Sequence, residues 1–363
     1  MKYYLIAGEA SGDLHGANLM RAILAKDPEA TFRFWGGDKM AEIPGSTQVE
    51  HYKNTAFMGF VEVLRHLPKI FGFIKKCKAD IRSFQPDRLI CIDYPGFNLR
   101  IVPFAKALGI DTVYYISPQV WAWKESRVKK IKQYVDRMLV ILPFEKSFYQ
   151  KHNYEVDYVG HPLLDEISAK NYEPALQADR PVIAILPGSR QQEIKSILPT
   201  FLSVVHKFPE YQFVLAGLHH INDDLYNNFL RNTSVKLVKG TTYELLNQAE
   251  AALVASGTAT LETALFKVPM LVAYKGNFLS YHLGKLLVKV PYISLVNLIA
   301  DRGLVREFIQ NDLNSENIES ELRRILEPKT GMAMREAYED IIQLLGQSGA
   351  SAKAADLIIN HSR

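Results

Sequence analysis

The sequence predicts an α/β protein with two domains, each built around a parallel β-sheet. Short apolar runs that suit buried strands alternate with segments of helical periodicity, which is the pattern of a parallel sheet. The 363 residues are more than one hydrophobic core usually holds, and they suit two domains of ordinary size. A polar stretch without periodicity, residues 170–180, separates the two halves of the chain.

The first predicted domain, residues 1–165, alternates strands with helices. Each predicted strand is a short run rich in apolar or β-branched residues, bounded by turn-forming residues. We expect six of them, at residues 2–7, 31–35, 88–92, 112–116, 137–142 and 155–159.

The second predicted domain, residues 175–340, repeats this pattern. Its strands are expected at residues 182–186, 213–216, 235–238, 252–255 and 269–274. Beyond residue 300 we predict only helices, and the segment 341–363 is predicted to be a C-terminal helix that packs back on the first domain.

Composition excludes several classes of protein. Apolar residues make up 48% and charged residues 23% of the chain, which is typical of a globular protein. The two cysteines, Cys77 and Cys91, form no CxxC pair, so we expect neither a disulfide framework nor a cysteine zinc site. No apolar run approaches the roughly 18 residues that span a bilayer, and the N-terminus lacks a signal-peptide pattern. A net charge of +4 does not indicate a nucleic-acid partner.

A turn between a strand and a helix in the second half suits a diphosphate. The apolar run ends at Ser256, and Gly257 lets a ligand approach the backbone. Thr258 and Thr260 begin a helix whose free N–H groups and positive dipole end favour anions. Glu262, one helical turn further on, could accept hydrogen bonds from ribose hydroxyls. The alternative is an ordinary turn with Ser256 as N-cap and Glu262 on a solvated face.

A second turn of this kind follows the strand at residues 182–186. It contains Gly188, Ser189 and Arg190, and a helical segment begins at residue 191. The helix N-terminus suits phosphate, and the Arg190 guanidinium adds a bidentate donor.

The first strand ends in a polar, glycine-containing loop. Its glycines do not have the G-x-G-x-x-G spacing, so a Rossmann cofactor is not indicated. The carboxyl end of a first strand is nonetheless a place where open α/β sheets bind ligands. Asp13 has the alternative of capping the next helix. The candidate ligand-facing residues of this loop are Glu9, Ser11, Asp13 and His15.

Asp93 follows the strand at residues 88–92 and stands beside a Pro-Gly turn. An acid at the carboxyl end of a strand is well placed for catalysis. After the next strand, Trp121 and Trp123 lie among cations, which indicates a platform at a cleft or a membrane edge. Core packing of one of these tryptophans is the alternative.

The segment 57–78 combines large apolar residues with lysines. It carries too many apolar groups for one narrow helical stripe, so some of them are expected to face outward. This pattern is typical of an interfacial segment that enters acyl chains while its cations meet anionic headgroups. A core helix with snorkelling lysines is the alternative. The proposed acyl and membrane contacts are Phe60, Leu64, Leu67, Phe71, Lys75 and Lys76.

Six motifs occur in the order of one known family. They are AGEASGDLHG at residues 7–16, SPQVWAW at 117–123, LPFEKSF at 142–148, LPGSR at 186–190, ASGTATLE at 255–262 and SLVNLIA at 294–300. Together they span nearly the whole chain, and the sequence resembles the lipid-A-disaccharide synthase family.

The resemblance implies a GT-B fold, in which two Rossmann-like domains face each other across a cleft. The implied reaction transfers 2,3-diacylglucosamine from UDP to 2,3-diacylglucosamine 1-phosphate (lipid X), with inversion and release of UDP. It further implies an enzyme that needs no metal or other cofactor and that is cytoplasmic and peripheral at the anionic inner face of the bacterial inner membrane. The sequence agrees in having no Asp-x-Asp and no histidine pair with ligand spacing on a helix.

The resemblance also orders the candidate residues. Asp93 is the expected base and His15 the reserve. Arg190 and the helix start at residues 257–260 are expected to offset diphosphate charge, with Glu262 on ribose and Asn297 on the uracil edge or the phosphates. Glu9, Ser11, Asp13 and Trp121 are expected on the acceptor side.

One position departs from the family pattern. The family often has a second acid near Asp93, where this chain has Gly96. Three other functions stay open at this point: a UDP-N-acetylglucosamine epimerase, a lipid-linked peptidoglycan transferase, or a non-catalytic nucleotide-sugar-binding protein. The sequence does not determine acyl-chain preference or oligomeric state.

Overall fold

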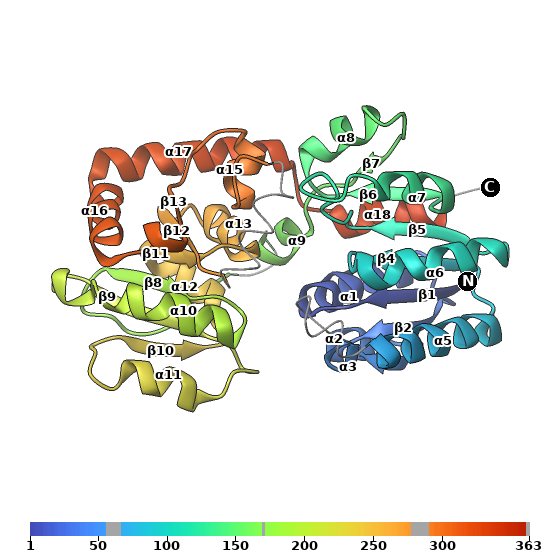
Figure 1. Cartoon of the computed structure of the whole chain (residues 1–363), viewed down its shortest axis with the longest axis horizontal. Helices are drawn as coiled ribbons and strands as arrows, with labels where there is room; N and C mark the ends of the chain where they lie inside the picture. The colour runs from blue at the N-terminus through green and yellow to red at the C-terminus, as the bar shows by residue number, and fades with distance from the viewer. Residues whose placement is uncertain (56–66, 169–170, 277–289, 361–363) are drawn as a thin grey trace. The chain divides into compact units, whose positions relative to one another are not determined.

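The computed structural model describes residues 1–55, 67–168, 171–276 and 290–360, and the chain divides into two compact units (Figure 1). Unit 1 comprises Met1–Asp165 together with Gln347–Arg363, and unit 2 comprises Glu166–Gly346. Each unit contains one parallel sheet flanked by helices, which confirms the predicted α/β class.

Within the described residues, the sheet of unit 1 has seven strands in the order β3-β2-β1-β4-β5-β6-β7. Every pairing in it is parallel. The strands are β1 (Lys2–Ala7), β2 (Thr31–Gly36), β3 (Ser46–His51), β4 (Arg88–Ile92), β5 (Asp111–Tyr115), β6 (Arg137–Val140) and β7 (Asp157–Tyr158).

Eight helices of unit 1, and a ninth (α9) that crosses into unit 2 after Asp165, fall within the described residues. Phenol and indole groups are hydrogen-bonded inside the core: Trp35 Nε1 donates to the Tyr4 hydroxyl at 2.8 Å, which donates to Asp80 at 2.9 Å. The helices are α1 (Ala10–Leu24), α2 (Asp38–Ala41), α3 (Tyr52–Thr55), α5 (Leu67–Phe84), α6 (Pro95–Ala107), α7 (Arg127–Tyr134), α8 (Pro143–Gln150), α9 (Pro162–Ser168) and α18 (Ala350–Ile359).

Unit 2 has a six-stranded parallel sheet among its described residues, in the order β10-β9-β8-β11-β12-β13. Its strands are β8 (Val182–Leu186), β9 (Gln212–Gly217), β10 (Lys236–Lys239), β11 (Ala249–Ala255), β12 (Met270–Tyr274) and β13 (Glu307–Ile309). Its α-helices are α10 (Gln191–Leu202), α11 (Asp223–Leu230), α12 (Thr242–Gln248), α13 (Thr258–Leu265), α15 (Leu295–Ala300), α16 (Ser315–Leu326) and α17 (Pro328–Leu345).

Two edge strands were not predicted. β3 is polar and mostly partly exposed, so it lacks the apolar run that identifies a buried strand. β13 has only three residues and lies where helices alone were expected, so that expectation was wrong. Both strands pair with a single neighbour, and tertiary contact rather than local sequence makes them strands.

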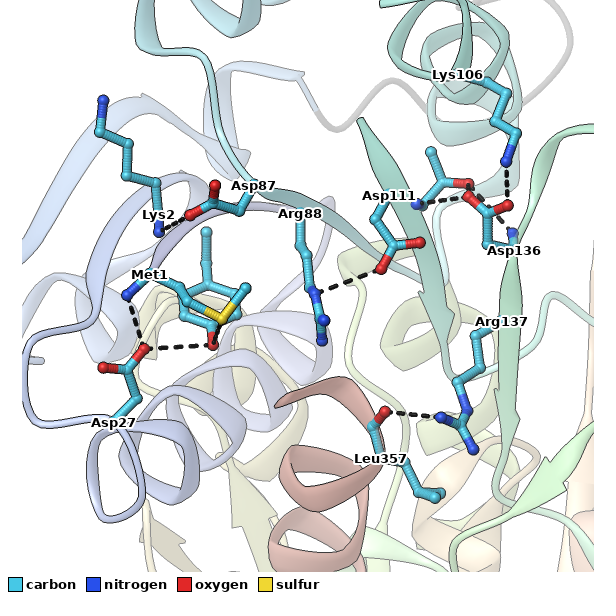
Figure 2. Close-up of polar contacts among 12 residues, drawn as sticks. Met1, Lys2, Asp27, Asp87, Arg88, Lys106, Asp111, Asp136, Arg137 and Leu357 are labelled. Atoms are coloured by element: carbon cyan, nitrogen blue, oxygen red, sulfur yellow. Dashed lines mark hydrogen bonds and ion pairs between the residues drawn. The ribbon is translucent and has the colours of Figure 1, made fainter. Parts of the chain in front are cut away.

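Polar contacts secure the amino ends of the strands in unit 1 (Figure 2). The Met1 ammonium pairs with Asp27 at 2.8 Å, and the Lys2 N–H donates to Asp87 at 2.7 Å. Arg88, at the start of β4, pairs with Asp111, at the start of β5, with 3.3 Å between Nε and Oδ2. These charged groups lie at the amino-terminal edge of the sheet. The candidate site residues lie at the opposite edge, at the carboxyl ends of the strands.

The C-terminal helix packs against the first domain, as predicted, because α18 contacts α1. The predicted helix at residues 341–363 is interrupted, however. α17 ends at Leu345, and both Gly346 and Gly349 have positive φ, which ends one helix before the next begins. The Asp165 carboxylate then accepts hydrogen bonds from the N–H groups of Gly349, Ala350 (3.1 Å) and Ser351 (2.9 Å).

We expect Asp165→Ala to lower the free energy of unfolding of unit 1 by about 1–2 kcal/mol, because it removes the cap of α18. Amide exchange should accelerate within residues 350–359, as measured by mass spectrometry. The control is Asp356→Ala, which breaks only the surface pair of Asp356 with Lys26 and should change stability by less than about 0.5 kcal/mol. Equal effects of the two changes would contradict the capping role.

Candidate functional site

Each sheet has a switch point in its centre, where strand order reverses. In unit 1, β1 lies beside β4, with Ala7 paired to Ile92. In unit 2, β8 lies beside β11, with Leu186 paired to Val254. Connections run in opposite directions from these two strand pairs, so a crevice opens at their carboxyl ends. The turns that the sequence singled out therefore lie next to one another within each unit: those after β1 and β4, and those after β8 and β11.

The turn after β4 is held in an unusual conformation. Asp93 and Tyr94 both have positive φ, at 42° and 47°. The Asp93 N–H donates to Tyr115 and Ile116 carbonyls at 3.3 and 3.2 Å, and its carbonyl accepts from Asn98 Nδ2 at 2.7 Å and from the Tyr114 hydroxyl. This strained turn persists because surrounding groups hold the backbone on both sides.

Gly8 completes the turn from the side of β1. A Cβ at Gly8 would lie 2.2 Å from the ring of Tyr94, so only glycine leaves room for that ring. The Tyr94 ring also stacks on Phe97 with 5.5 Å between centroids, and its hydroxyl donates to the Thr55 carbonyl at 2.8 Å. Packing of Tyr94 thus fixes the position of Asp93 next to it.

The Asp93 carboxylate is reached by water, but the protein around it disfavours its charged form. Desolvation, with a smaller contribution from the neighbouring Glu9 carboxylate, raises the pKa of Asp93 to about 7. A carboxylate with a pKa near neutral can both take and release a proton at neutral pH. The arrangement can therefore perform general base chemistry.

The residues after Glu9 form a helix rather than the predicted loop. α1 begins at Ala10, and Gly12 and Gly16 let it lie close to the sheet; a Cβ at Gly12 would lie 3.2 Å from the Ala7 Cβ. Ser11 is exposed and Glu9 is partly exposed at the helix start. His15 is buried near His161, whose pKa is lowered to about 3 by burial and by His15.

The structure corrects the expectation for Asp13. Its buried carboxylate accepts hydrogen bonds from the N–H groups of Gly37 (2.7 Å), Lys39 (3.1 Å) and Met40 (3.2 Å). It therefore caps α2, a helix distant in sequence, rather than its own helix. Both carboxylate oxygens take part in this cap, and a contact of Asp13 with the acceptor stays a prediction.

The buried carboxylate of Glu145, which the sequence did not single out, connects the segment after β5 to the segment after β6. Glu145 accepts hydrogen bonds from Trp121 Nε1 at 3.2 Å and from the N–H groups of Ile141 (3.2 Å) and Leu142 (2.9 Å). Burial raises the pKa of Glu145 to about 7. Trp121 is therefore held in place, while Trp123 is 38% exposed. The available signal was a Glu three residues after the N-cap position.

In unit 2, the turn after β8 is closed by the protein itself. Gly188 has a φ of 113°, which favours glycine. The N–H groups of Ser189 and Arg190 donate to Glu193 Oε2 at 2.9 and 3.2 Å, and Arg190 Nη1 donates to Oε1 at 2.9 Å. The predicted phosphate-binding groups are thus present, and in this structure they donate their hydrogen bonds to the Glu193 carboxylate.

The turn after β11 differs from this arrangement. Gly257, not Ser256, is the N-cap of α13, and the Ser256 hydroxyl donates to the Ile293 carbonyl at 3.2 Å. Thr260 is buried, and its hydroxyl donates to Gly257 O at 2.8 Å. Gly257 and Thr258 are exposed, and a Cβ at Gly257 would meet no atom within 4 Å. The start of α13 is therefore accessible to a ligand.

Glu262 lies one turn into α13 and is partly buried rather than on a solvated face. Its Oε1 accepts a hydrogen bond from the Tyr243 hydroxyl at 3.1 Å, and burial raises the pKa of Glu262.

Asn297 has a structural task that the sequence did not indicate. It is buried; Nδ2 donates to Val305 O and to Glu307 Oε1, and Oδ1 accepts from the Val305 N–H, each at 2.9 Å. These bonds tie α15 to β13. These contacts use both amide hydrogens and one lone pair of Oδ1, and a role of Asn297 in nucleotide binding stays a prediction.

The described part of the apolar and basic segment is α5. Phe71 is 60% exposed and Lys75 is exposed, whereas Phe73 packs edge-on against Trp35 with 6.0 Å between centroids. Lys76 pairs with Glu50 at 2.6 Å. Phe60, Leu64 and the side chain of Leu67 lie outside the described residues. Among the described helices, none has the length and apolar character to cross a membrane.

Two parallel α/β units with polar turns at both switch points define the GT-B class. Similar folds are found in the solved glycotransferase of kitacinnamycin (TM-score 0.69, 15% identity, 99% of this chain and 98% of that chain). They are also found in UDP-GlcNAc 2-epimerase from Neisseria meningitidis bound to UDP-GlcNAc (TM-score 0.65, 15% identity, 99% and 100%). At these identities the likeness concerns the fold alone.

Sequence comparison defines the family within this class. Residues 3–359 match the family model described as lipid-A-disaccharide synthetase. The lipid-A-disaccharide synthase of Trichlorobacter lovleyi is 39% identical over 369 residues, covering 98% of this chain and 96% of the relative. The chain belongs to the lipid-A-disaccharide synthase family. Members of this family are glycosyltransferases.

The raised pKa of Asp93 makes stability depend on pH. The unfolded value is near 4 and the folded value near 7, so the folded protein binds more protons between them and loses stability as pH rises through this window. We subtract the melting temperature of wild type from that of Asp93→Asn. We expect this difference to be more positive at pH 8 than at pH 4.

Thermal unfolding of both proteins at pH 4, 6 and 8 measures this. Asparagine also tolerates positive φ, which adds an offset at every pH. Only the pH-dependent part reports the pKa, and a difference that stays constant from pH 4 to 8 would contradict it. Glu9→Gln should lower the pKa of Asp93, because it removes the neighbouring like charge.

Proposed function

We propose that this protein joins UDP-2,3-diacylglucosamine and 2,3-diacylglucosamine 1-phosphate into the β-1,6-linked lipid A disaccharide 1-phosphate, with release of UDP. The family match over residues 3–359 carries this proposal. The relative from Trichlorobacter lovleyi has the corresponding name, and the epimerase of similar fold was solved with UDP-GlcNAc, a UDP-linked glucosamine derivative.

Asp93 is the proposed general base. Inversion at the anomeric carbon needs one displacement, in which a base takes the proton of the acceptor 6-hydroxyl as UDP leaves. Asp93 suits this role because its pKa is about 7 and its backbone is held on both sides. Glu9 and Ser11 follow β1 and the loop of Trp121 follows β5, the strands on either side of β4, and these residues are the proposed acceptor side.

Unit 2 is the proposed nucleotide-binding unit. The N–H groups at the start of α13 and the Arg190 guanidinium would offset the charge that builds on the diphosphate. Glu262, held by Tyr243, would accept hydrogen bonds from the ribose hydroxyls. Gly188, Ser189, Ser256, Gly257, Thr258 and Thr260 complete this proposed site through their backbone and hydroxyl groups.

α5 is the proposed place of contact with the membrane. Substrates with two acyl chains need an apolar receiving surface, since each buried CH₂ contributes about 0.8 kcal/mol. The exposed Phe71 ring and the Lys75 and Lys76 ammonium groups would meet acyl chains and anionic headgroups. The protein would then act as a peripheral enzyme at the cytoplasmic face of the inner membrane.

A UDP-release assay with the diacylated donor and acceptor tests the reaction. We expect Asp93→Asn to lower turnover by roughly 10²–10⁴-fold while UDP affinity stays the same, which is the usual scale for a general base. Gly96→Asp is the control beside it. A Cβ at position 96 would meet no atom within 4 Å, so this variant should fold and remain active.

Absence of UDP release by the wild type would refute the proposed reaction. Turnover of Asp93→Asn near the wild-type value would move the base elsewhere, with His15 next in order. A loss of activity in Gly96→Asp would show that this turn requires glycine for its function.

The membrane contact has its own test. Phe71→Ser should weaken binding to vesicles of anionic phospholipid by roughly tenfold. The variant loses the free energy of about 1.5–3 kcal/mol that burial of a phenylalanine ring contributes. Met332→Ser on α17 is the matched control, since Met332 is also 60% exposed. Co-sedimentation measures both variants, and equal binding by the two would remove α5 from the membrane contact.

A further inference from the structure

The carboxylate of Glu193 occupies the position that the turn after β8 offers to an anion. One of its oxygens accepts two backbone N–H groups, those of Ser189 and Arg190, and the other accepts the Arg190 guanidinium. Two backbone donors and one guanidinium are the set of groups that holds a phosphate oxygen at a helix N-terminus. Glu193 therefore satisfies the same donors that a diphosphate would use.

The same side chain also fills the space above Gly188. A Cβ at Gly188 would lie 2.6 Å from Glu193 Oε2 and 2.7 Å from its Cβ. Glycine at this position lets a group come close to the backbone, and in this structure that group is the Glu193 side chain. A ligand phosphate and the Glu193 carboxylate cannot both use this space.

Glu193 is not locked in place by burial. Its side chain is 29% exposed and that of Arg190 is 53% exposed, so both can rotate into water. The other group at the turn is His220, whose Nε2 lies 3.2 Å from the Ser189 carbonyl. Across the switch point, the start of α13 has an exposed Gly257 and Thr258 and no such carboxylate among the described residues. Of the two helix starts at this edge, one is open and one is closed by the chain itself.

We propose that Glu193 competes with the diphosphate of the bound nucleotide for the Ser189–Arg190 turn and so limits the affinity for UDP. The proposal rests on the proposed UDP site in unit 2. When UDP binds, the diphosphate displaces the carboxylate and takes over the two N–H groups and the guanidinium. The need for displacement lowers the affinity for UDP more than that for UMP and leaves uridine unaffected, and the returning carboxylate assists release of UDP.

The test compares UDP, UMP and uridine binding to wild type and to Glu193→Gln by titration calorimetry. Glutamine keeps the shape but removes the negative charge, so it competes less well and no longer holds Arg190. A hydrogen bond to a charged group is worth enough to change affinity by about tenfold. We expect Glu193→Gln to bind UDP about tenfold more tightly, UMP by a smaller factor and uridine unchanged within twofold.

Two further variants make the result specific. Glu210→Gln removes the same charge from an exposed residue just before β9, at the opposite edge of the sheet, and should leave all three affinities unchanged. Arg190→Ala should weaken UDP binding by roughly tenfold without affecting uridine. Melting temperatures of all variants measure the capping contribution separately from affinity.

Each outcome decides a different statement. If wild type binds UDP but Glu193→Gln binds it no more tightly, Glu193 only caps α10 and the competition is refuted. If uridine and UDP gain equally, the effect does not come from the diphosphate, and the proposal also fails. If wild type binds no UDP, the nucleotide site itself is refuted, and this proposal with it.

Discussion

The parallel pairing of two central strands in each sheet is the constraint on which the rest of the structure depends. β1 beside β4 and β8 beside β11 bring four strand ends to two edges, and the helices that follow start at these edges. Helix N-termini carry unsatisfied N–H groups, and strand ends carry turns that side chains can reach. The strained backbone at Asp93 and the tight turn at Gly188 occur at these positions.

Residues with ligand chemistry divide into two groups according to what their hydrogen bonds hold. Asp13, Glu145 and Asn297 are buried, and their bonds connect segments of one unit to each other. Asp93 and Glu262 remain reachable at the surface and have raised pKa values. Buried polar groups must be satisfied by the protein, so the first group stabilises connections within its unit, whereas carboxylates of the second group can still be reached from the surface.

The two helix starts in unit 2 illustrate how one local motif can have two states. Both follow a buried strand and a Gly-Ser or Ser-Gly turn, and both suit an anion. At α10 the third residue of the helix is Glu193, which reaches back to the turn, whereas α13 has Thr260 there, whose hydroxyl returns to its own helix. A single side chain therefore decides whether the donors of a helix start are occupied by the protein.

The sequence by itself determined the class of fold, most of the buried strands and the turns that carry Asp93, Arg190 and Glu262, because apolar periodicity and turn chemistry are local properties. It could not reveal β3 and β13, since edge strands lack a continuous apolar run. Only the tertiary structure decided which turns are neighbours, because strand order depends on crossovers rather than on neighbouring residues. It also decided the tasks of Asp13 and Asn297, whose partners lie 24 to 27 and 8 to 10 residues away along the chain. A hydrogen-bond partner at such a distance leaves no mark on the local pattern, so a carboxylate that caps a helix and one that faces a ligand look the same in sequence.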